Sequence, residues 1–177
     1  MGDQKEVRRT TIILDDKDRQ YLESLIKEGK ETGFKTFVTK MFDVYRSLGM
    51  DDWKSPGVYY RGISRIAIIT QEVFDLLVNM IPDNKVIEAG KQIGETMSTI
   101  FRTDMDLNTK RKENLTEVFK QLGILGLGEF VFKDNLIVVR GPYINNVKMF
   151  VAFLEGLAGV KLQPRTTSPP LVIEVQK

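Results

Sequence analysis

The chain has 177 residues, 42% hydrophobic and 28% charged, which is ordinary for one medium or two small globular domains. Its formal net charge is only +2, so no overall basic field points to nucleic acid. The absence of Cys and His excludes disulfides, thiol nucleophiles, His-based general base catalysis and the usual zinc sites.

Composition and apolar runs also bear on the compartment. A chain without Cys fits a reducing cytoplasm. The first residues, MGDQKEVRRTT, lack the apolar segment of a secretion signal. No apolar run approaches the roughly 20 residues that a membrane-spanning helix needs. We therefore expect a cytoplasmic protein with no membrane partner.

Residues 7–14 alternate between two faces, as the side chains of a β-strand do. One face carries Arg9, Thr11 and Ile13, and the other carries Arg8, Ile12 and Leu14. A helix is expected to follow, with Asp15 or Asp16 as its N-cap and more acid in its first turn. Its apolar stripe ends near Gly29.

The next predicted helix, over residues 34–48, has the most regular apolar spacing in the chain. Its side chains recur at i, i+3, i+4 and i+7, and Gly49 suits the C-cap. The stripe consists of Phe34, Phe37, Val38, Met41, Phe42, Tyr45 and Leu48. One short neighbouring helix cannot cover so much apolar surface.

Residues 49–57 are polar, contain Pro and Gly, and indicate a linker or boundary. Beyond them, helices and strands are interspersed with a hairpin that has Asp134-Asn135 at its tip. The expected elements are a strand over 63–70, helices over 71–81, 86–101, 115–122 and 147–157, a hairpin within 122–142 and a strand over 171–175. This order favours an α+β fold over a purely parallel sheet.

The N-terminal strand and two helices do not form a closed unit by themselves, because one strand leaves its backbone groups unpaired. A two-fold dimer pairs the strands antiparallel and buries the helix stripes together. Each large apolar side chain buried in this way contributes roughly 1.5–3 kcal/mol. The predicted dimer core is Ile12, Leu14, Phe37, Val38, Met41 and Phe42.

The segments RRTTIILDDKDRQYLESLI and GFKTFVTKMFDVYRSL resemble the ribbon-helix-helix family of DNA-binding proteins, which includes the Arc, MetJ and CopG repressors. The resemblance covers residues 8–48, essentially the whole family motif. Asp15 departs from the Pro of many members, and the turn EGKETG is long for the family.

The resemblance implies that two paired strands lie in the major groove of double-stranded DNA. Arg9, Thr11 and Ile13 would then face the base edges, where Arg can bind guanine and Ile can meet a thymine methyl. Phosphate contacts are expected from Arg8 and from the start of the second helix, at Gly33, Lys35 and Thr36. Two simpler interpretations stay open: an edge strand with a solvated arginine pair, and a module for dimerisation alone.

The segments EAGKQIGETM, LTEVFKQLGILGLGEFVF, FVAFLEGLAGV and LVIEV resemble the 4-vinyl-reductase-type domain, a relative of the small subunits of TRAPP vesicle-tethering complexes. The resemblance covers most of residues 63–175 and implies an α+β sensor or dimerisation unit with an apolar pocket. Candidate pocket residues are Phe101, Phe119, Phe150 and Phe153, although their helical spacing favours an ordinary core. The Cys residues usual near the final strands are missing, so we expect no metal.

Two glycine-rich stretches do not indicate a cofactor. Gly90 and Gly94 lie inside a predicted helix, which favours a close helix crossing over a phosphate loop. GILGLG follows a helix, whereas a dinucleotide fingerprint follows a strand. No spacing of carboxylates or nucleophiles assembles an acid–base pair. We expect neither an enzyme nor a cofactor.

The sequence thus predicts a ribbon-helix-helix domain for DNA binding and dimerisation over residues 1–50, a linker over 51–60 and an α+β effector-sensing or dimerisation domain over 61–177. The predicted function is a sequence-specific transcriptional regulator, a homodimer or higher oligomer, with a small apolar ligand as effector. An antitoxin-like or adaptor protein, whose C-terminal domain binds a partner protein, is the alternative.

Overall fold

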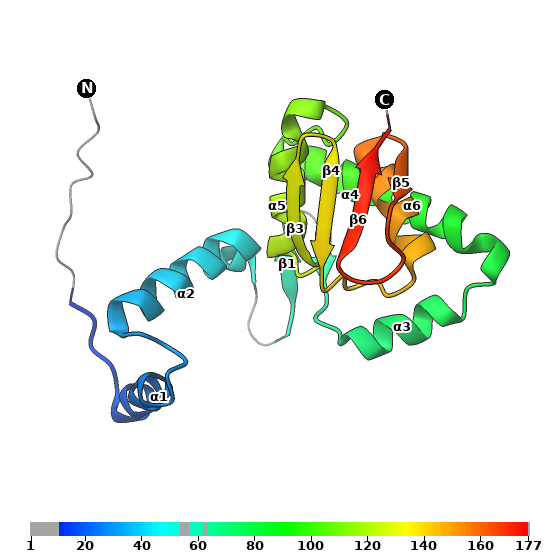
Figure 1. Cartoon of the computed structure of the whole chain (residues 1–177). Helices are drawn as coiled ribbons and strands as arrows, with labels where there is room; N and C mark the ends of the chain where they lie inside the picture. The colour runs from blue at the N-terminus through cyan, green and yellow to red at the C-terminus, as the bar shows by residue number, and fades with distance from the viewer. Residues whose placement is uncertain (1–10, 54–56, 62–63, 177) are drawn as a thin grey trace, which may run out of the picture. The chain divides into compact units, whose positions relative to one another are not determined.

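The computed structural model describes residues 11–53, 57–61 and 64–176 (Figure 1). Helices alternate with antiparallel strands, so the predicted α+β class is confirmed. The chain divides into two compact units, Met1–Tyr45 and Arg46–Lys177.

The N-terminal unit contains helix α1 (Asp16–Lys27) and most of helix α2 (Phe34–Leu48). Asp15 is the N-cap of α1, because its carboxylate accepts a hydrogen bond of 2.8 Å from the backbone N–H of Asp18. Gly49 follows α2 with a φ of +61°, the left-handed conformation expected at a helix C-terminus.

The segment before α1 is not a strand in this single chain. Residues 11–14 have no regular secondary structure, and Arg8 and Arg9 lie outside the described residues. A strand exists only where a second strand takes up its backbone hydrogen bonds. A prediction that pairs this segment with a second copy is therefore not tested by one chain.

The C-terminal unit is built on a four-stranded antiparallel sheet. The strand order is β3 (Glu129–Lys133), β4 (Leu136–Arg140), β6 (Leu171–Val175) and β5 (Leu162–Pro164). The predicted hairpin is confirmed as β3–β4, joined by Asp134-Asn135, and the predicted final strand is confirmed as β6. Strand β5 was not predicted.

A separate short hairpin precedes the first helix of this unit. It consists of β1 (Tyr59–Arg61) and β2 (Ser64–Ile66). The predicted strand over 63–70 is wrong in its extent, because residues 67–70 are in no strand. β1 offers only three residues for pairing, and β2 ends where that pairing ends.

Among its described residues the C-terminal unit has four further helices, and each matches a predicted helix to within a few residues. They are α3 (Gln71–Asn79), α4 (Val86–Met105), α5 (Leu115–Ile124) and α6 (Val147–Ala158). Short 3₁₀ turns lie at Met50–Asp52, Asp83–Lys85 and Lys112–Asn114. In Figure 1 the strands lie side by side, with α4 and α6 behind them.

The core of this unit lies between the sheet and α6. The inner face of the sheet buries Ile137, Val139, Leu171 and Ile173 completely. Helix α6 contributes nine buried residues and packs tightly along α4. A Cβ atom added at Gly94 would lie 2.1 Å from the carbonyl oxygen of Phe153. The two backbones are therefore in contact, and the predicted close helix crossing is confirmed.

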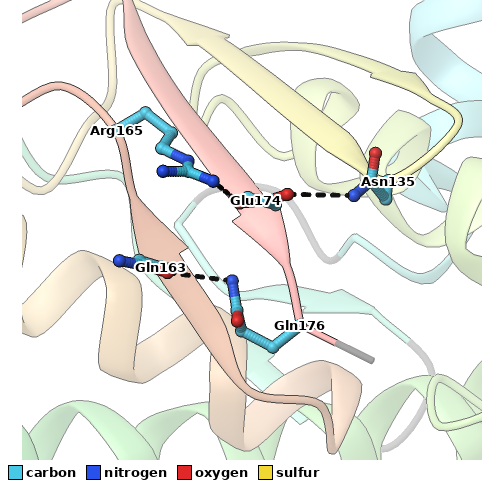
Figure 2. A network of polar contacts seen from close by, with 5 residues as sticks. All are labelled: Asn135, Gln163, Arg165, Glu174 and Gln176. Carbon is cyan, nitrogen blue, oxygen red and sulfur yellow. Dashed lines mark hydrogen bonds and ion pairs between the residues drawn. The ribbon is translucent and has the colours of Figure 1, made fainter.

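Polar side chains tie the end of the sheet together (Figure 2). The carboxylate of Glu174 on β6 accepts hydrogen bonds from Arg165, in the loop after β5, and from Asn135 at the hairpin tip. The side chain of Gln176 donates to that of Gln163 on β5 at 3.1 Å. The Arg165 and Gln163 contacts hold β5 and the loop after it against β6, and the Asn135 contact joins β6 to the hairpin.

Candidate nucleic-acid interface

The segment that precedes α1 has two different faces. Thr11 and Ile13 are exposed, and Ile13 is the most exposed large apolar residue described, at 92%. Ile12, although 45% exposed, and the half-buried Leu14 border a hollow of about 390 Å³ that Leu22, Ile26 and Phe34 also line. Every second side chain of the segment thus turns toward the helices, and those between turn away.

The start of α2 carries the charge pattern of an anion-binding helix end. The N–H groups of Phe34, Lys35 and Thr36 lie in the first turn, where no intrahelical acceptor exists. This turn contains no acidic residue, and the side chains of Lys35 and Thr36 are exposed. The backbone dipole and the Lys35 cation together favour a bound anion such as phosphate.

The two helices of this unit differ at this end. At the start of α1 the Asp15 carboxylate accepts the N–H of Asp18, and Asp16 and Asp18 place negative charge in the first turn, which the helix dipole favours. Helix α2 begins after Gly33, whose carbonyl accepts the first helical hydrogen bond, from Phe37, at 3.0 Å. Of the two helix starts, the one at α2 is open to an external anion.

The residues predicted to form a dimer core are poorly covered in one chain. No residue of α2 is buried, and Met41 and Phe42 are 52% and 57% exposed. Phe37, Val38 and Leu14 are half-buried. Among the described residues of this unit, Leu22 alone is buried. The apolar stripe of α2 therefore lacks a covering element within its own unit.

Phe34 was missing from the predicted core. It lies in the hollow beside Ile12 and Leu14, although the prediction began with Phe37. Its position three residues before Phe37, on the same helix face, is the sequence signal that could have placed it there.

In the C-terminal unit the four candidate pocket residues belong to the core. Phe101, Phe119, Phe150 and Phe153 are at most 2% exposed, and the rings of Phe150 and Phe153 stack at 6.3 Å. This packing agrees with the interpretation as ordinary core. Phe119 also borders a hollow of about 450 Å³, next to Phe130 and Phe132.

A larger hollow lies where α4 and α6 begin. Its volume is about 690 Å³, and its lining is mostly apolar. The apolar lining includes Val86, Ile87, Val147, Val151 and Ala152, and the charged side chains Asp83, Lys148 and Glu155 also contribute. Glu155 is held by its contact with Lys91 at 3.6 Å and by the backbone N–H of Leu162. This hollow has the size and lining of a small-ligand site.

Within the described part of the chain, no group of three or more acidic side chains lies close enough to hold a metal ion. None of the described helices is both long and apolar enough to cross a bilayer. The chain matches no protein-family model, no curated protein and no solved structure.

Proposed function

We propose that the chain is a sequence-specific DNA-binding transcriptional regulator that acts as a homodimer. The observation that carries this proposal is the uncovered apolar stripe of α2, in a unit where Leu22 alone is buried among the described residues. A stable globular unit needs a core, and a second copy supplies one at once. Phe37, Met41 and Phe42 of both chains would then pack together.

The same dimer supplies a partner for the N-terminal segment. Residues 8–14 of two copies pair antiparallel, which gives each strand its backbone hydrogen bonds. Ile12 and Leu14 face the helices, and Arg9, Thr11 and Ile13 face outward. Since water hydrates an exposed Ile side chain poorly, the 92% exposure of Ile13 supports a contact with a thymine methyl.

Phosphate contacts position this ribbon on the duplex. The open start of α2, with Lys35 and Thr36, binds one phosphate through backbone N–H groups and a cation. Arg8, which lies outside the described residues, is a further phosphate contact. Base contacts give the sequence preference, and these phosphate contacts give affinity that falls with salt.

We further propose that the C-terminal unit senses a small apolar ligand. The hollow of about 690 Å³ at the start of α4 and α6 supports this role better than the four core phenylalanines do. A Val151→Trp variant fills the hollow, and we expect it to lose a ligand that mass spectrometry detects in protein purified without denaturation. Finding no apolar compound in either protein would contradict this role.

DNA binding is tested by selecting an operator from a random duplex pool and measuring affinity by fluorescence anisotropy. We expect Arg9→Ala to cost about 1–3 kcal/mol and to relax the base preference. Lys35→Ala should weaken binding to all DNA sequences alike. It should also reduce the slope of log affinity against log salt concentration by about 1. Lys17→Ala, on the acidic start of α1, is the matched control and should change neither. Unchanged affinity and preference in Arg9→Ala, or a pool that yields no preferred sequence, would overturn the proposal.

A further inference from the structure

The four-stranded sheet of the C-terminal unit ends in two different edge strands. At one edge β5 has three residues and ends at Pro164, which has no N–H to offer a further strand. At the other edge (Figure 1) β3 has five residues, EFVFK, and no described strand pairs with its outer side. Proteins usually block an exposed edge with a proline, a bulge or an inward-pointing charge. β3 has none of these, because its pairing with β4 is continuous and its inward side chains are Phe130 and Phe132.

The hairpin turn determines which backbone groups of β3 are free. Lys133 and Leu136 flank the two-residue turn and form a hydrogen-bonded pair. Hydrogen-bonded pairs alternate with non-hydrogen-bonded ones along an antiparallel ladder, so the N–H and C=O groups of Phe130 and Phe132 point away from β4. In the described part of the chain no hydrogen bond from outside the hairpin reaches these four groups. They are available to another strand.

The sequence of β3 is complementary to itself when two copies run antiparallel. A two-fold axis at Val131 places Glu129 opposite Lys133 of the second copy, and the reverse pair forms on the other side of the axis. The same register places Phe130 opposite Phe132 of the second copy, so that the free backbone groups of both copies bond to each other. Opposite charges and aromatic rings are favourable pairs across neighbouring strands. The charges of this edge therefore favour a second copy in this register.

Glu129 and Lys133 have no other partner among the described residues. Both side chains are exposed, and neither makes an ion pair or a side-chain hydrogen bond there. Arg140 lies opposite Glu129 on β4 but forms no ion pair with it. Val131 lies between the two charges on the same face and is 57% exposed. Pairing with a second copy gives both charges a partner and packs the two Val131 side chains together at the axis.

The inner side of this edge has room for the side chains of a paired strand. Helix α5 packs on β3, and a hollow of about 450 Å³ remains between them. It is lined by Thr116, Phe119, Lys120, Gly123, Ile124, Phe130 and Phe132. Because Thr116 and Gly123 are small, the side of α5 that lines the hollow leaves space for aromatic rings. The phenylalanines of a second β3 would point to this side of the sheet.

We infer that β3 is a self-association edge, which pairs antiparallel with β3 of a second copy across a two-fold axis at Val131. The two four-stranded sheets then form one continuous sheet. The inference rests on the proposed function, because two five-residue strands are too short to hold free proteins together. The dimer of N-terminal units supplies the second copy at an effective concentration in the millimolar range.

Because the chain has no cysteine, a Val131→Cys variant of the full-length protein reports this pairing. In the inferred register Val131 forms a non-hydrogen-bonded pair with its own copy, where Cα atoms about 4.5 Å apart suit a disulfide. We expect an intermolecular disulfide at least about tenfold faster than in the control Leu76→Cys. Leu76 and Val131 are 61% and 57% exposed and belong to the same unit, so exposure and tether are matched. Equal rates for the two variants would overturn the inference.

Charge reversal tests the register. In the Val131→Cys protein, adding Glu129→Lys should slow cross-linking about tenfold, because lysines of the two copies then face each other. A further Lys133→Glu change reverses both pairs and should restore the rate. Lys17→Glu in its place restores the net charge at an exposed site of the other unit and should leave cross-linking slow. A Glu129→Lys, Lys133→Glu protein that stays slow would overturn the inference.

The inference and the proposed function fail in different ways. A dimer with normal operator binding and slow Val131→Cys cross-linking overturns the inference alone. Protection of that thiol from a maleimide would then mean that another molecule or another segment of the chain covers β3. A monomer without operator binding overturns the proposed function and, with it, the source of the second copy.

Discussion

The two units differ in how many of their apolar side chains are buried within a single chain. Helix α6 buries nine residues against the sheet and α4, whereas α2, which has the most regular apolar spacing in the chain, buries none. In the C-terminal unit Phe150 is 0% exposed, and in the N-terminal unit Phe42 is 57% exposed. The comparison teaches that periodicity predicts which face of a helix is apolar but not which chain covers it.

The largest expected effect tests the complete core. Phe150→Ala should destabilise the C-terminal unit by about 3–5 kcal/mol, because the truncation removes a fully buried ring and leaves a cavity. Denaturant unfolding measures the loss, and its midpoint should not depend on protein concentration. A concentration-dependent midpoint would mean that this core, too, is completed by another chain.

The matching change in the N-terminal unit is Phe42→Ala. If a second copy buries this side chain, the variant should weaken dimerisation by roughly 1.5–3 kcal/mol for each ring removed, as measured by analytical ultracentrifugation. Val44→Ala is the control, because Val44 lies on α2 outside the apolar stripe and is 42% exposed. An equal effect of both changes would contradict a dimer core centred on the stripe.

A smaller effect is expected from a contact of the N-terminal unit that one chain makes by itself. Asp15→Ala removes the cap of α1, whose hydrogen bond to the Asp18 N–H is 2.8 Å long. The loss should be about 1 kcal/mol of stability, visible in thermal melts followed by circular dichroism. Asp15→Asn keeps an N-capping side chain and should restore most of it; no difference between the two variants would contradict the capping role.

The smallest expected effect is a pH dependence in the C-terminal unit. Hydrogen bonds from its own backbone N–H and from Thr70 hold the pKa of Glu72 below its ordinary value of 4.5. The charged carboxylate therefore adds stability that is fully present above the ordinary pKa and is lost as pH falls through the lowered one. Glu72→Gln should flatten the curve of stability against pH in the range below pH 4.5. An unchanged curve would contradict the assignment.

Sequence reasoning succeeded where short-range signals decide the structure. The Asp134-Asn135 turn between apolar runs identified the hairpin, and helical spacing located all four helices of the C-terminal unit. Strand β5 has only three residues, ends at Pro164 and exists through pairing with β6, so no local signal predicted it. The predicted strand over 63–70 was too long because pairing with β1 determines where β2 ends.

For the candidate site, the sequence predicted that successive side chains before α1 point in opposite directions. In the structure Ile13 is exposed, and Leu14 points toward the helices. The sequence did not show that Leu76, Leu77 and Met80 stay exposed at α3, because apolar spacing does not tell which side chains a neighbouring element covers. The proposed pairing of two N-terminal strands needs a second chain, so the structure of one chain does not test it.

The most direct test of the central claim is sedimentation equilibrium of the full chain and of a Phe42→Asp variant at micromolar concentration. We predict a mass of twice 20.2 kDa or a higher even multiple for the unaltered chain, and 20.2 kDa for the variant, because a charge at Phe42 prevents the helices from packing. A mass of 20.2 kDa for the unaltered chain would contradict the claim that a second copy completes the N-terminal unit.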